Sequence, residues 1–202
     1  MIDSKEKSKT AFNQQAATYD EDTYGAHARN LYPALLKKLS SLQYSTVLDL
    51  GCGTGEVMQA IILEAPDTKI YGIDISENMV RKAKEKLKNN ASINVGDSEH
   101  LPYEDEMFDV VYCNDSFHHY PNPKTVMAEV SRVLKPRGTF IIGDCWQPFL
   151  SRTIMNIFMR FSNEGDVKMY SEREICSMLN AYFHDTVWQK VNHASFLVSA
   201  VK

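Results

Sequence analysis

The first residues with recognisable chemistry form a glycine-rich turn, and a second carboxylate follows it along the chain. Gly51, Gly53 and Gly55 come directly after a short apolar run that contains Asp49, and Asp74 lies nineteen residues past Gly55. Glycine lets a chain turn sharply and lets its backbone approach a ligand where a Cβ would obstruct it. A carboxylate at the end of the next strand can accept both hydroxyls of a ribose. The pattern therefore predicts a site for an adenosine-containing cofactor.

The glycine spacing and the neighbouring charge indicate which cofactor fits. A dinucleotide-binding turn favours G-x-G-x-x-G and sets a pyrophosphate against the following helix, whereas Gly51, Gly53 and Gly55 give G-x-G-x-G. The Asp49 carboxylate would repel a pyrophosphate and attract an ammonium or sulfonium group. We therefore expect a cationic cofactor that carries an amino acid, and an NAD-dependent oxidoreductase is the alternative interpretation.

Short apolar runs that alternate with helical patterns must position these residues. Five runs have the length and the abrupt ends of buried strands: residues 46–50, 69–74, 92–95, 108–113 and 139–143. The helical patterns between them predict β-α-β units and a doubly wound α/β sheet. Residues 184–190 and 194–201 are joined by a tight turn, so we expect them to form an antiparallel hairpin.

Several polar residues and one proline mark the expected helix starts. Ser76 and Asn122 are expected to cap helices with their side chains, and the proline after Asn122 suits a first helical position. Residues 171–174 read Ser-Glu-Arg-Glu, which is typical of a capping box. Pro33 is expected in the first turn of a helix that begins near His27.

Segments of residues 46–143 resemble the motifs of class I S-adenosylmethionine-dependent methyltransferases, the family that includes the ubiquinone and menaquinone C-methyltransferases. The matching segments are the first motif at 47–55, the ribose-binding segment at 72–79, the adenine-binding turn at 96–98, the fourth strand at 108–114 and the stretch before the fifth strand at 129–138. Arg137 departs from the family pattern, which commonly has a second glycine at this position. Because Arg137 is expected on a loop, the departure affects only the expected conformation of that loop.

The resemblance implies a Rossmann-like, seven-stranded sheet of order 3-2-1-4-5-7-6 with strand 7 antiparallel, and S-adenosyl-L-methionine as cofactor. Asp74 is then expected on the ribose, and Asp97 with Ser98 on the adenine. Ile75 and Met79 are expected to sandwich the adenine ring. The cofactor-binding residues that the resemblance implies are Tyr19, Asp49, Gly51, Cys52, Gly53, Asp74, Ile75, Met79, Asp97, Ser98, Asn114 and Ser116.

The methionine portion of the cofactor is expected beside the glycine turn. Asp49 and the backbone of the turn would hold it, and Asn114 and Ser116 could hydrogen-bond to it. Tyr19 either belongs to a segment that closes over the cofactor or is a surface aromatic residue packed on that segment. The Cys52 thiol is expected to fill a small space and not to act as a nucleophile.

Two adjacent histidines follow the fourth strand, at the edge where a substrate would meet the cofactor. One hypothesis is that His118 or His119 is catalytic and positions or deprotonates the methyl acceptor. The alternative is a loop histidine that packs on Tyr120. We expect no metal site, because the sequence does not reveal a third ligand.

We expect residues 1–202 to form a single methyltransferase domain. Residues 1–30 are expected to be an N-terminal cap segment, and residues 144–170 an insertion that shapes the acceptor pocket. A helix in this insertion carries one apolar face, which would form the inner wall of a lid or a dimer surface. The residues of that face are Ile154, Ile157, Phe158 and Phe161.

Composition excludes several classes of protein. The chain has 22 Lys and Arg against 26 Asp and Glu, a net charge of −4, so we expect no nucleic-acid partner. Its apolar runs are too short to predict a membrane span. The four cysteines include no C-x-x-C pair, which is consistent with reduced thiols and a cytoplasmic location.

The predicted function is transfer of a methyl group to a small-molecule acceptor. A homodimer is one expected form of the protein. A non-catalytic S-adenosylmethionine-binding module is a further alternative.

Overall fold

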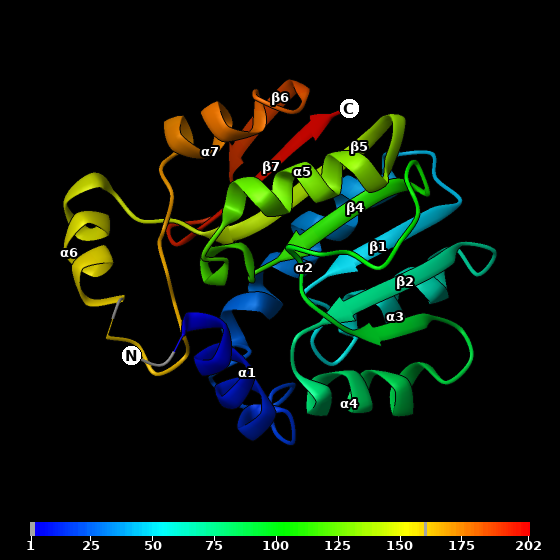
Figure 1. Ribbon diagram of the computed structural model, residues 1–202, viewed down its shortest axis with the longest axis horizontal. Helices are drawn as coiled ribbons and strands as arrows, with labels where there is room; N and C mark the ends of the chain where they lie inside the picture. The colour runs from blue at the N-terminus through cyan, green and yellow to red at the C-terminus, as the bar shows by residue number, and fades with distance from the viewer. Residues whose placement is uncertain (1–2, 160) are drawn as a thin grey trace.

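The computed structural model describes residues 3–159 and 161–202, in which a seven-stranded sheet carries helices on both faces (Figure 1). The strands are β1 (Thr46–Leu50), β2 (Lys69–Asp74), β3 (Ser92–Val95), β4 (Phe108–Asn114), β5 (Leu134–Cys145), β6 (His184–Lys190) and β7 (Ser195–Val201). Their order is β3-β2-β1-β4-β5-β7-β6, and β7 is antiparallel to both of its neighbours. The fold expected from the sequence is confirmed.

The described helices are α1 (Ser4–Gln15), α2 (Ala26–Ser40), α3 (Glu56–Glu64), α4 (Glu77–Leu87), α5 (Pro123–Val133), α6 (Phe149–Met159) and α7 (Glu172–Leu179), with a 3-10 turn, η1 (Phe117–His119). Five of these helices pack on the sheet through two separate apolar clusters. One cluster joins the sheet to α5 and α7, and the other joins its opposite face to α2, α3 and α4. The central strands β1 and β4 are therefore buried on both faces, which explains their almost uninterrupted apolar sequences.

Three details differ from the expectations. Strand β5 is longer than residues 139–143, because Leu134 already pairs with Phe108 across an irregularity in the ladder. Pro33 lies inside α2 and not in its first turn. Helix α5 begins at the proline after Asn122, but Asn122 does not cap it, since its side-chain amide donates to the Glu99 carboxylate at 3.0 Å. The caps expected at Ser76 and at residues 171–174 are confirmed.

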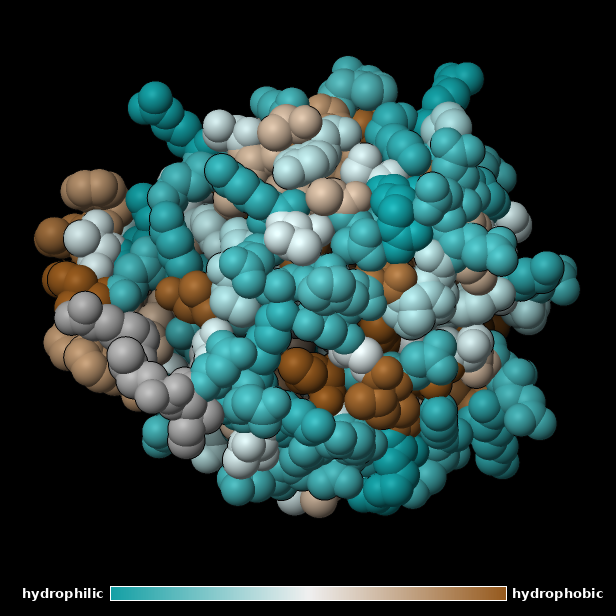
Figure 2. All heavy atoms as spheres, in the orientation of Figure 1, coloured by the Kyte–Doolittle hydropathy of each residue, from teal (hydrophilic) through white to brown (hydrophobic). Residues whose placement is uncertain are grey.

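The insertion helix α6 stands away from the sheet at the left of Figure 1. Only Met159 of this helix is buried, and the apolar face expected to point inward is exposed. Figure 2 shows the resulting cluster of hydrophobic surface at the same end of the molecule. The face of Ile154, Ile157 and Phe158 is therefore open to solvent in this structure, and its role as the inner wall of a lid stays a prediction.

None of the helices in the described part of the chain combines the length and the hydropathy that a membrane crossing needs.

Candidate functional site

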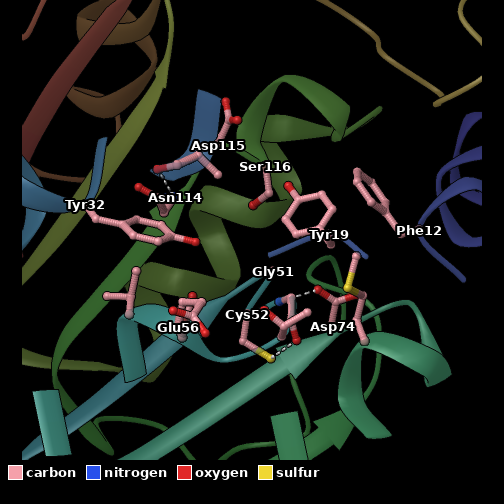
Figure 3. A pocket seen from close by; sticks show the side chains of 16 residues that line it. Phe12, Tyr19, Tyr32, Gly51, Cys52, Glu56, Asp74, Asn114, Asp115 and Ser116 are labelled. Carbon is pink, nitrogen blue, oxygen red and sulfur yellow. Dashed lines mark hydrogen bonds between the residues drawn. The ribbon is translucent and has the colours of Figure 1, made fainter. Parts of the chain in front are cut away.

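The carboxyl ends of β1, β2 and β4 enclose a cavity, which we call the turn cavity (Figure 3). Between β1 and β4 the strand order changes direction, with β2 and β3 on one side and β5 on the other. Doubly wound sheets bind ligands at such a point. Nine of the expected cofactor residues line the turn cavity: Tyr19, Asp49, Gly51, Cys52, Gly53, Asp74, Met79, Asn114 and Ser116. The other lining residues include Phe12, Tyr32, Glu56 and Asp115.

The glycine turn requires backbone conformations that favour glycine. Gly51 and Gly53 have φ values of +79° and +52°. A Cβ on Gly51 would lie 2.4 Å from the Ser116 hydroxyl oxygen, whereas a Cβ on Gly53 would meet no protein atom within 4 Å. Ser116 in turn donates to the Leu50 carbonyl at 3.1 Å and thereby supports the turn. The open space at Gly53 is available to a ligand.

Asp74 fixes the turn from the neighbouring strand. Its carboxylate accepts hydrogen bonds from the backbone N–H of Gly53 at 2.9 Å and of Ser76 at 2.8 Å. Burial raises the pKa of Asp74 above its ordinary value, and these N–H donors partly offset that effect. Asp74 therefore orders the turn as well as facing the cavity.

Asp49 contributes a buried acceptor that no described protein group satisfies. It is 3% exposed, and its Oδ2 accepts a hydrogen bond from the Tyr112 hydroxyl at 2.8 Å, while Oδ1 has no donor in the described part of the chain. The Asn114 Oδ1 atom is also buried without a donor. Burial raises the pKa of Asp49 to about 8. Two unsatisfied acceptors in one cavity suit a donor-rich cation such as an ammonium group.

A second cavity, which we call the Asp97 cavity, adjoins the turn cavity. It contains Ile75, Asp97 and Ser98 and shares Gly51, Asp74 and Ser116 with the turn cavity. All twelve expected cofactor residues therefore line one of two adjoining cavities. Ile75 lines the Asp97 cavity and Met79 lines the turn cavity, so the expected sandwich around the adenine ring stays a prediction.

Helix α1 covers both cavities. Lys5 contacts the carboxylates of Asp97 at 2.7 Å and Glu99 at 2.8 Å. Asn13 accepts hydrogen bonds from the Ser76 hydroxyl at 2.7 Å and the Asn78 backbone at 3.0 Å. The Asn13 contacts hold α1 against the start of α4, and the Lys5 contacts hold it against the loop after β3. Each cavity keeps a space of about 60 Å³.

A larger pocket of about 340 Å³, which we call the outer pocket, lies beyond Phe12, Tyr19 and Asp115. Those three residues also line the turn cavity, so the two spaces adjoin. Burial raises the pKa of the Tyr19 hydroxyl well above its ordinary value. The insertion supplies much of the remaining wall through Cys145, Gln147, Met155, Met159, Glu164, Asp166 and Met169.

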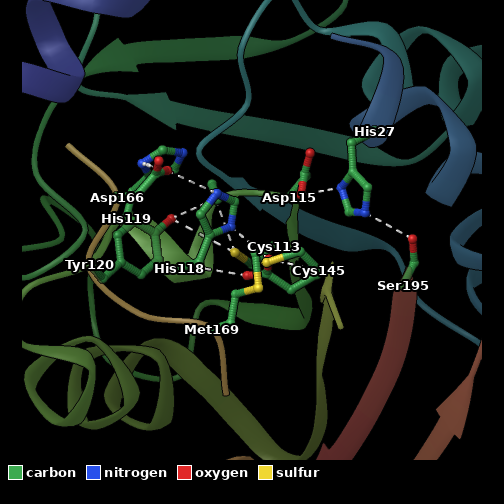
Figure 4. A network of polar contacts seen from close by, with 12 residues as sticks. His27, Cys113, Asp115, His118, His119, Tyr120, Cys145, Asp166, Met169 and Ser195 are labelled. Atoms are coloured by element: carbon green, nitrogen blue, oxygen red, sulfur yellow. Dashed lines mark hydrogen bonds and ion pairs between the residues drawn. The ribbon is translucent and has the colours of Figure 1, made fainter. Parts of the chain in front are cut away.

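His118 and His119 line this outer pocket, and His119 also lines the Asp97 cavity. Figure 4 shows their polar contacts. The His118 Nδ1 atom bonds to the buried Asp144 carboxylate at 2.6 Å. Burial opposes a charged imidazole, but the charge and hydrogen bond of Asp144 raise the pKa of His118 well above its ordinary value. Burial and the neighbouring His118 lower the pKa of His119 well below its ordinary value. Asp166 lies beside both rings.

On the other side of the outer pocket, a chain of polar contacts links α2 to β7. Asp115 contacts His27 Nδ1 at 2.6 Å, and His27 Nε2 lies 2.9 Å from the Ser195 hydroxyl (Figure 4). Although burial works against the charge, Asp115 raises the pKa of His27 above its ordinary value. Ser195 is fully buried, so its hydroxyl is not available as a nucleophile for a substrate. The three residues instead stabilise the packing of α2 against β7.

Cys52 lines the turn cavity as a thiol. Burial raises its pKa well above the ordinary value, and the charges of Asp74 and Asp49 add to this effect. A thiol with a raised pKa is a poor nucleophile. This agrees with the expectation that Cys52 fills space.

Sequence reasoning missed several residues of the site. Asp115 directly follows β4, and Asp144 is the last residue but one of β5. Their position at the carboxyl edge of the sheet could have marked them as site residues. Phe12 and Asp166 carried no such signal, because α1 and the loop after α6 reach the site only through tertiary packing.

Comparisons with known proteins agree with this geometry. A family described as "Methyltransferase domain" matches residues 43–193. The demethylmenaquinone methyltransferase of Lactococcus lactis is 33% identical over 154 residues, which cover 72% of this chain and 61% of that protein. The chain spans less than two thirds of the length of the first curated relatives that it matches.

Solved structures share the fold. A protein of Pyrococcus horikoshii superimposes with a TM-score of 0.69 at 30% identity, over 91% of this chain and 92% of that one. Phosphoethanolamine N-methyltransferase 2 of Haemonchus contortus, solved with S-adenosyl-L-methionine, superimposes with a TM-score of 0.73 at 19% identity, over 86% of this chain and 52% of that one.

Proposed function

The chain belongs to the class I S-adenosylmethionine-dependent methyltransferase family, and on this basis we propose that it transfers a methyl group from S-adenosylmethionine to a small-molecule acceptor. The cofactor would occupy the turn cavity and the Asp97 cavity, and the acceptor would occupy the outer pocket. In this arrangement the adjoining walls at Phe12, Tyr19 and Asp115 would bring the two ligands next to each other. Such alignment of the acceptor with the S–CH₃ bond can supply several kcal/mol of the rate enhancement.

The observation that carries this proposal is the set of carboxyl groups that line the turn cavity. Four carboxylates line it, from Asp49, Glu56, Asp74 and Asp115, and none of its described lining residues is a lysine or an arginine. Such a cavity favours the ammonium and sulfonium groups of S-adenosylmethionine. It disfavours the pyrophosphate of NAD, which argues against the oxidoreductase alternative.

The cofactor would contact residues from both cavities. We propose that Asp49 and Asn114 accept hydrogen bonds from the methionine ammonium group, because each has a buried oxygen without a described donor. Asp74 would accept from the ribose, and Asp97 with Ser98 would face the adenine. The other proposed contacts are those of Tyr19, Gly51, Cys52, Gly53, Ile75, Met79 and Ser116.

Helix α1 would act as a cap in this account. We propose that α1 moves away from the cavities when the cofactor enters, because residues of α1 line both of them. When the cofactor binds, the adenine would replace Lys5 as the partner of Asp97, so the contacts of Lys5 with Asp97 and Glu99 would have to break. The division into a cap at 1–30 and an insertion at 144–170 within one domain is part of this proposal.

The outer pocket distinguishes an enzyme from a module that only binds the cofactor. A binding module has no need of a second space beside the methyl group, and here that space is about 340 Å³ and contains two histidines. We propose that His118 and His119 position the acceptor. A cytoplasmic location and the lack of a nucleic-acid partner remain predictions.

Replacement of His118 or His119 by Asn should reduce turnover about tenfold or more, because both rings line the outer pocket. S-adenosylmethionine affinity should stay the same in the His118 variant, since His118 lines neither cofactor cavity, whereas His119 also lines the Asp97 cavity. Steady-state rates and calorimetry on each variant measure the two effects. His184→Asn, on the exposed strand β6, is the control. Unchanged rates in both variants would remove the proposed role.

The affinity for S-adenosylmethionine should increase with pH up to about pH 8. The pKa of Asp49 is about 8 in the empty protein, and a cationic ligand favours the ionised form, so binding below pH 8 releases a proton. The dependence should approach tenfold per pH unit and disappear in Asp49→Asn. Calorimetry between pH 6 and 8 measures it, and an affinity that falls over this range would contradict the assignment.

The exposed face of α6 is the proposed contact of a homodimer. Leu150 and Phe158 on this face are 70% and 65% exposed. Sedimentation velocity should show a dimer that the double substitution Leu150→Glu and Phe158→Glu converts to a monomer. Leu63→Glu, at a position on α3 that is 79% exposed, should leave the dimer intact. A wild-type monomer at all concentrations would contradict the dimer.

The proposed activity is tested by incubating the protein with methyl-tritiated S-adenosylmethionine and a panel of small molecules that offer carbon, nitrogen, oxygen or sulfur nucleophiles. Transfer of label to a member of the panel, with S-adenosylhomocysteine formed in equal amount, is the expected result. Binding of NAD without binding of S-adenosylmethionine would overturn the proposal.

A further inference from the structure

We propose that His118, His119 and Asp166 form a binding site for a divalent transition-metal ion in the wall of the outer pocket. The inference concerns the acceptor side of the function proposed above. Its test measures metal binding alone and does not depend on turnover. It replaces the expectation of no metal site, because the fold supplies the third ligand that the sequence did not reveal.

The three candidate ligand atoms are already close together. Asp166 Oδ1 lies 3.5 Å from His118 Nε2 and 3.3 Å from His119 Nδ1 (Figure 4). Each of the three residues offers one ligand atom within 4.8 Å of those of the other two. Ligands bound to a tetrahedral ion at about 2.0–2.1 Å are separated by about 3.3 Å. The two separations that involve Asp166 therefore match those around a bound ion. Small rotations of the rings would bring the two histidine nitrogens to a matching separation.

One of the three candidate ligand atoms is buried without a hydrogen bond. His119 is 8% exposed, and its Nδ1 has no hydrogen-bond partner in the described part of the chain. A buried polar atom without a partner is costly, and an ion would satisfy it. The contacts of Asp166 with the two rings are longer than ordinary hydrogen bonds.

Asp144 holds His118 in the orientation that metal binding requires. It bonds to Nδ1 at 2.6 Å and also accepts a hydrogen bond from the His118 backbone N–H at 2.9 Å. A histidine ligand is commonly fixed in this way, with a carboxylate on one ring nitrogen and the metal on the other. The alternative cluster of His118, Asp144 and Cys145 also brings ligand atoms together. It competes with the short His118–Asp144 hydrogen bond, so we favour Asp166.

The ligand set indicates the chemistry of the ion. Two imidazole nitrogens and one carboxylate oxygen suit Zn²⁺, Fe²⁺ or Co²⁺ better than Mg²⁺ or Ca²⁺, which prefer oxygen ligands. Three protein ligands leave a coordination position open, as catalytic sites do. That position would face the outer pocket and could take an oxygen or nitrogen atom of the acceptor.

The test is titration of the full chain with Co²⁺, followed by its visible absorption, and with Zn²⁺ by calorimetry, after treatment with a chelator and in the presence of a reductant. We expect one ion per chain. Asp166→Ala and His119→Gln should weaken binding about tenfold or more. Asp166→Asn provides a milder variant if Asp166→Ala does not fold, and circular dichroism monitors folding.

Two substitutions serve as controls. Cys145→Ser and His184→Asn, an exposed histidine next to Asp185, should leave the affinity unchanged. Absence of binding, wild-type affinity in both folded Asp166 variants, or loss of binding only in a control variant would each overturn the proposal. Affinity for S-adenosylmethionine measured without metal tests the proposed function separately, so failure of one proposal is distinguishable from failure of the other.

Discussion

Asp49→Asn should reduce the affinity for S-adenosylmethionine about 100-fold. The wild-type carboxylate is buried and has one oxygen without a described donor, so the cofactor ammonium group would supply both charge and hydrogen bonds. Removal of one partner of a buried, charge-assisted contact costs about 3 kcal/mol, which corresponds to this loss. Calorimetry with S-adenosylmethionine and with S-adenosylhomocysteine measures the effect on both ligands.

The substitution keeps the size of the side chain and its contact with the Tyr112 hydroxyl. The variant should therefore remain folded, as circular dichroism and thermal unfolding can establish. A folded Asp49→Asn protein that binds S-adenosylmethionine as tightly as the wild type would contradict the role given to Asp49.

Asp109→Ala should lower the free energy of unfolding by about 2 kcal/mol. The Asp109 carboxylate accepts hydrogen bonds from the backbone N–H and hydroxyl groups of Ser45 and Thr46, at 2.8 to 3.0 Å, and pairs with Lys135 at 2.8 Å. These contacts join the starts of β1, β4 and β5. Denaturant unfolding measures the loss, and Asp105→Ala, at a carboxylate 74% exposed, should cost less than about 0.5 kcal/mol.

The same carboxylate should make stability depend on acid pH. Partial burial opposes its charge, but Lys135 and the donors of Ser45 and Thr46 lower the pKa of Asp109 below its ordinary value. As the pH falls, the Asp109 carboxylate takes up a proton at a higher pH in the unfolded chain than in the folded protein. The stabilisation is therefore complete above about pH 4 and is lost as the pH falls below it. Asp109→Ala should lose part of that dependence and keep its affinity for S-adenosylmethionine, since Asp109 is not in the turn cavity. An unchanged unfolding curve would contradict the account.

The sheet and the cofactor side of the site could be predicted from sequence because each depends on local pattern. Apolar runs of strand length determine β1 and β2, and parallel strands bring their carboxyl ends to one edge. Asp49, Gly53 and Asp74 therefore lie together, although Asp49 and Asp74 are far apart in the chain.

The rest of the site depends on long-range packing that no local pattern records. Lys5 meets Asp97 across 92 residues, and Asp166 reaches His118 from a loop that follows α6. The apolar pattern of α6 indicated an amphipathic helix but not the direction of its face. The Ile154 and Phe158 side chains point to solvent because little of the sheet lies beneath this helix.

The central claim is that the loop after β1 seats a positively charged sulfonium nucleoside. Isothermal titration of S-adenosylmethionine into the full chain, with NAD as the comparison ligand, tests this claim most directly. We predict saturable binding of one S-adenosylmethionine per chain and no binding of NAD. A titration with no binding of S-adenosylmethionine, at any temperature where the protein is folded, would contradict the account.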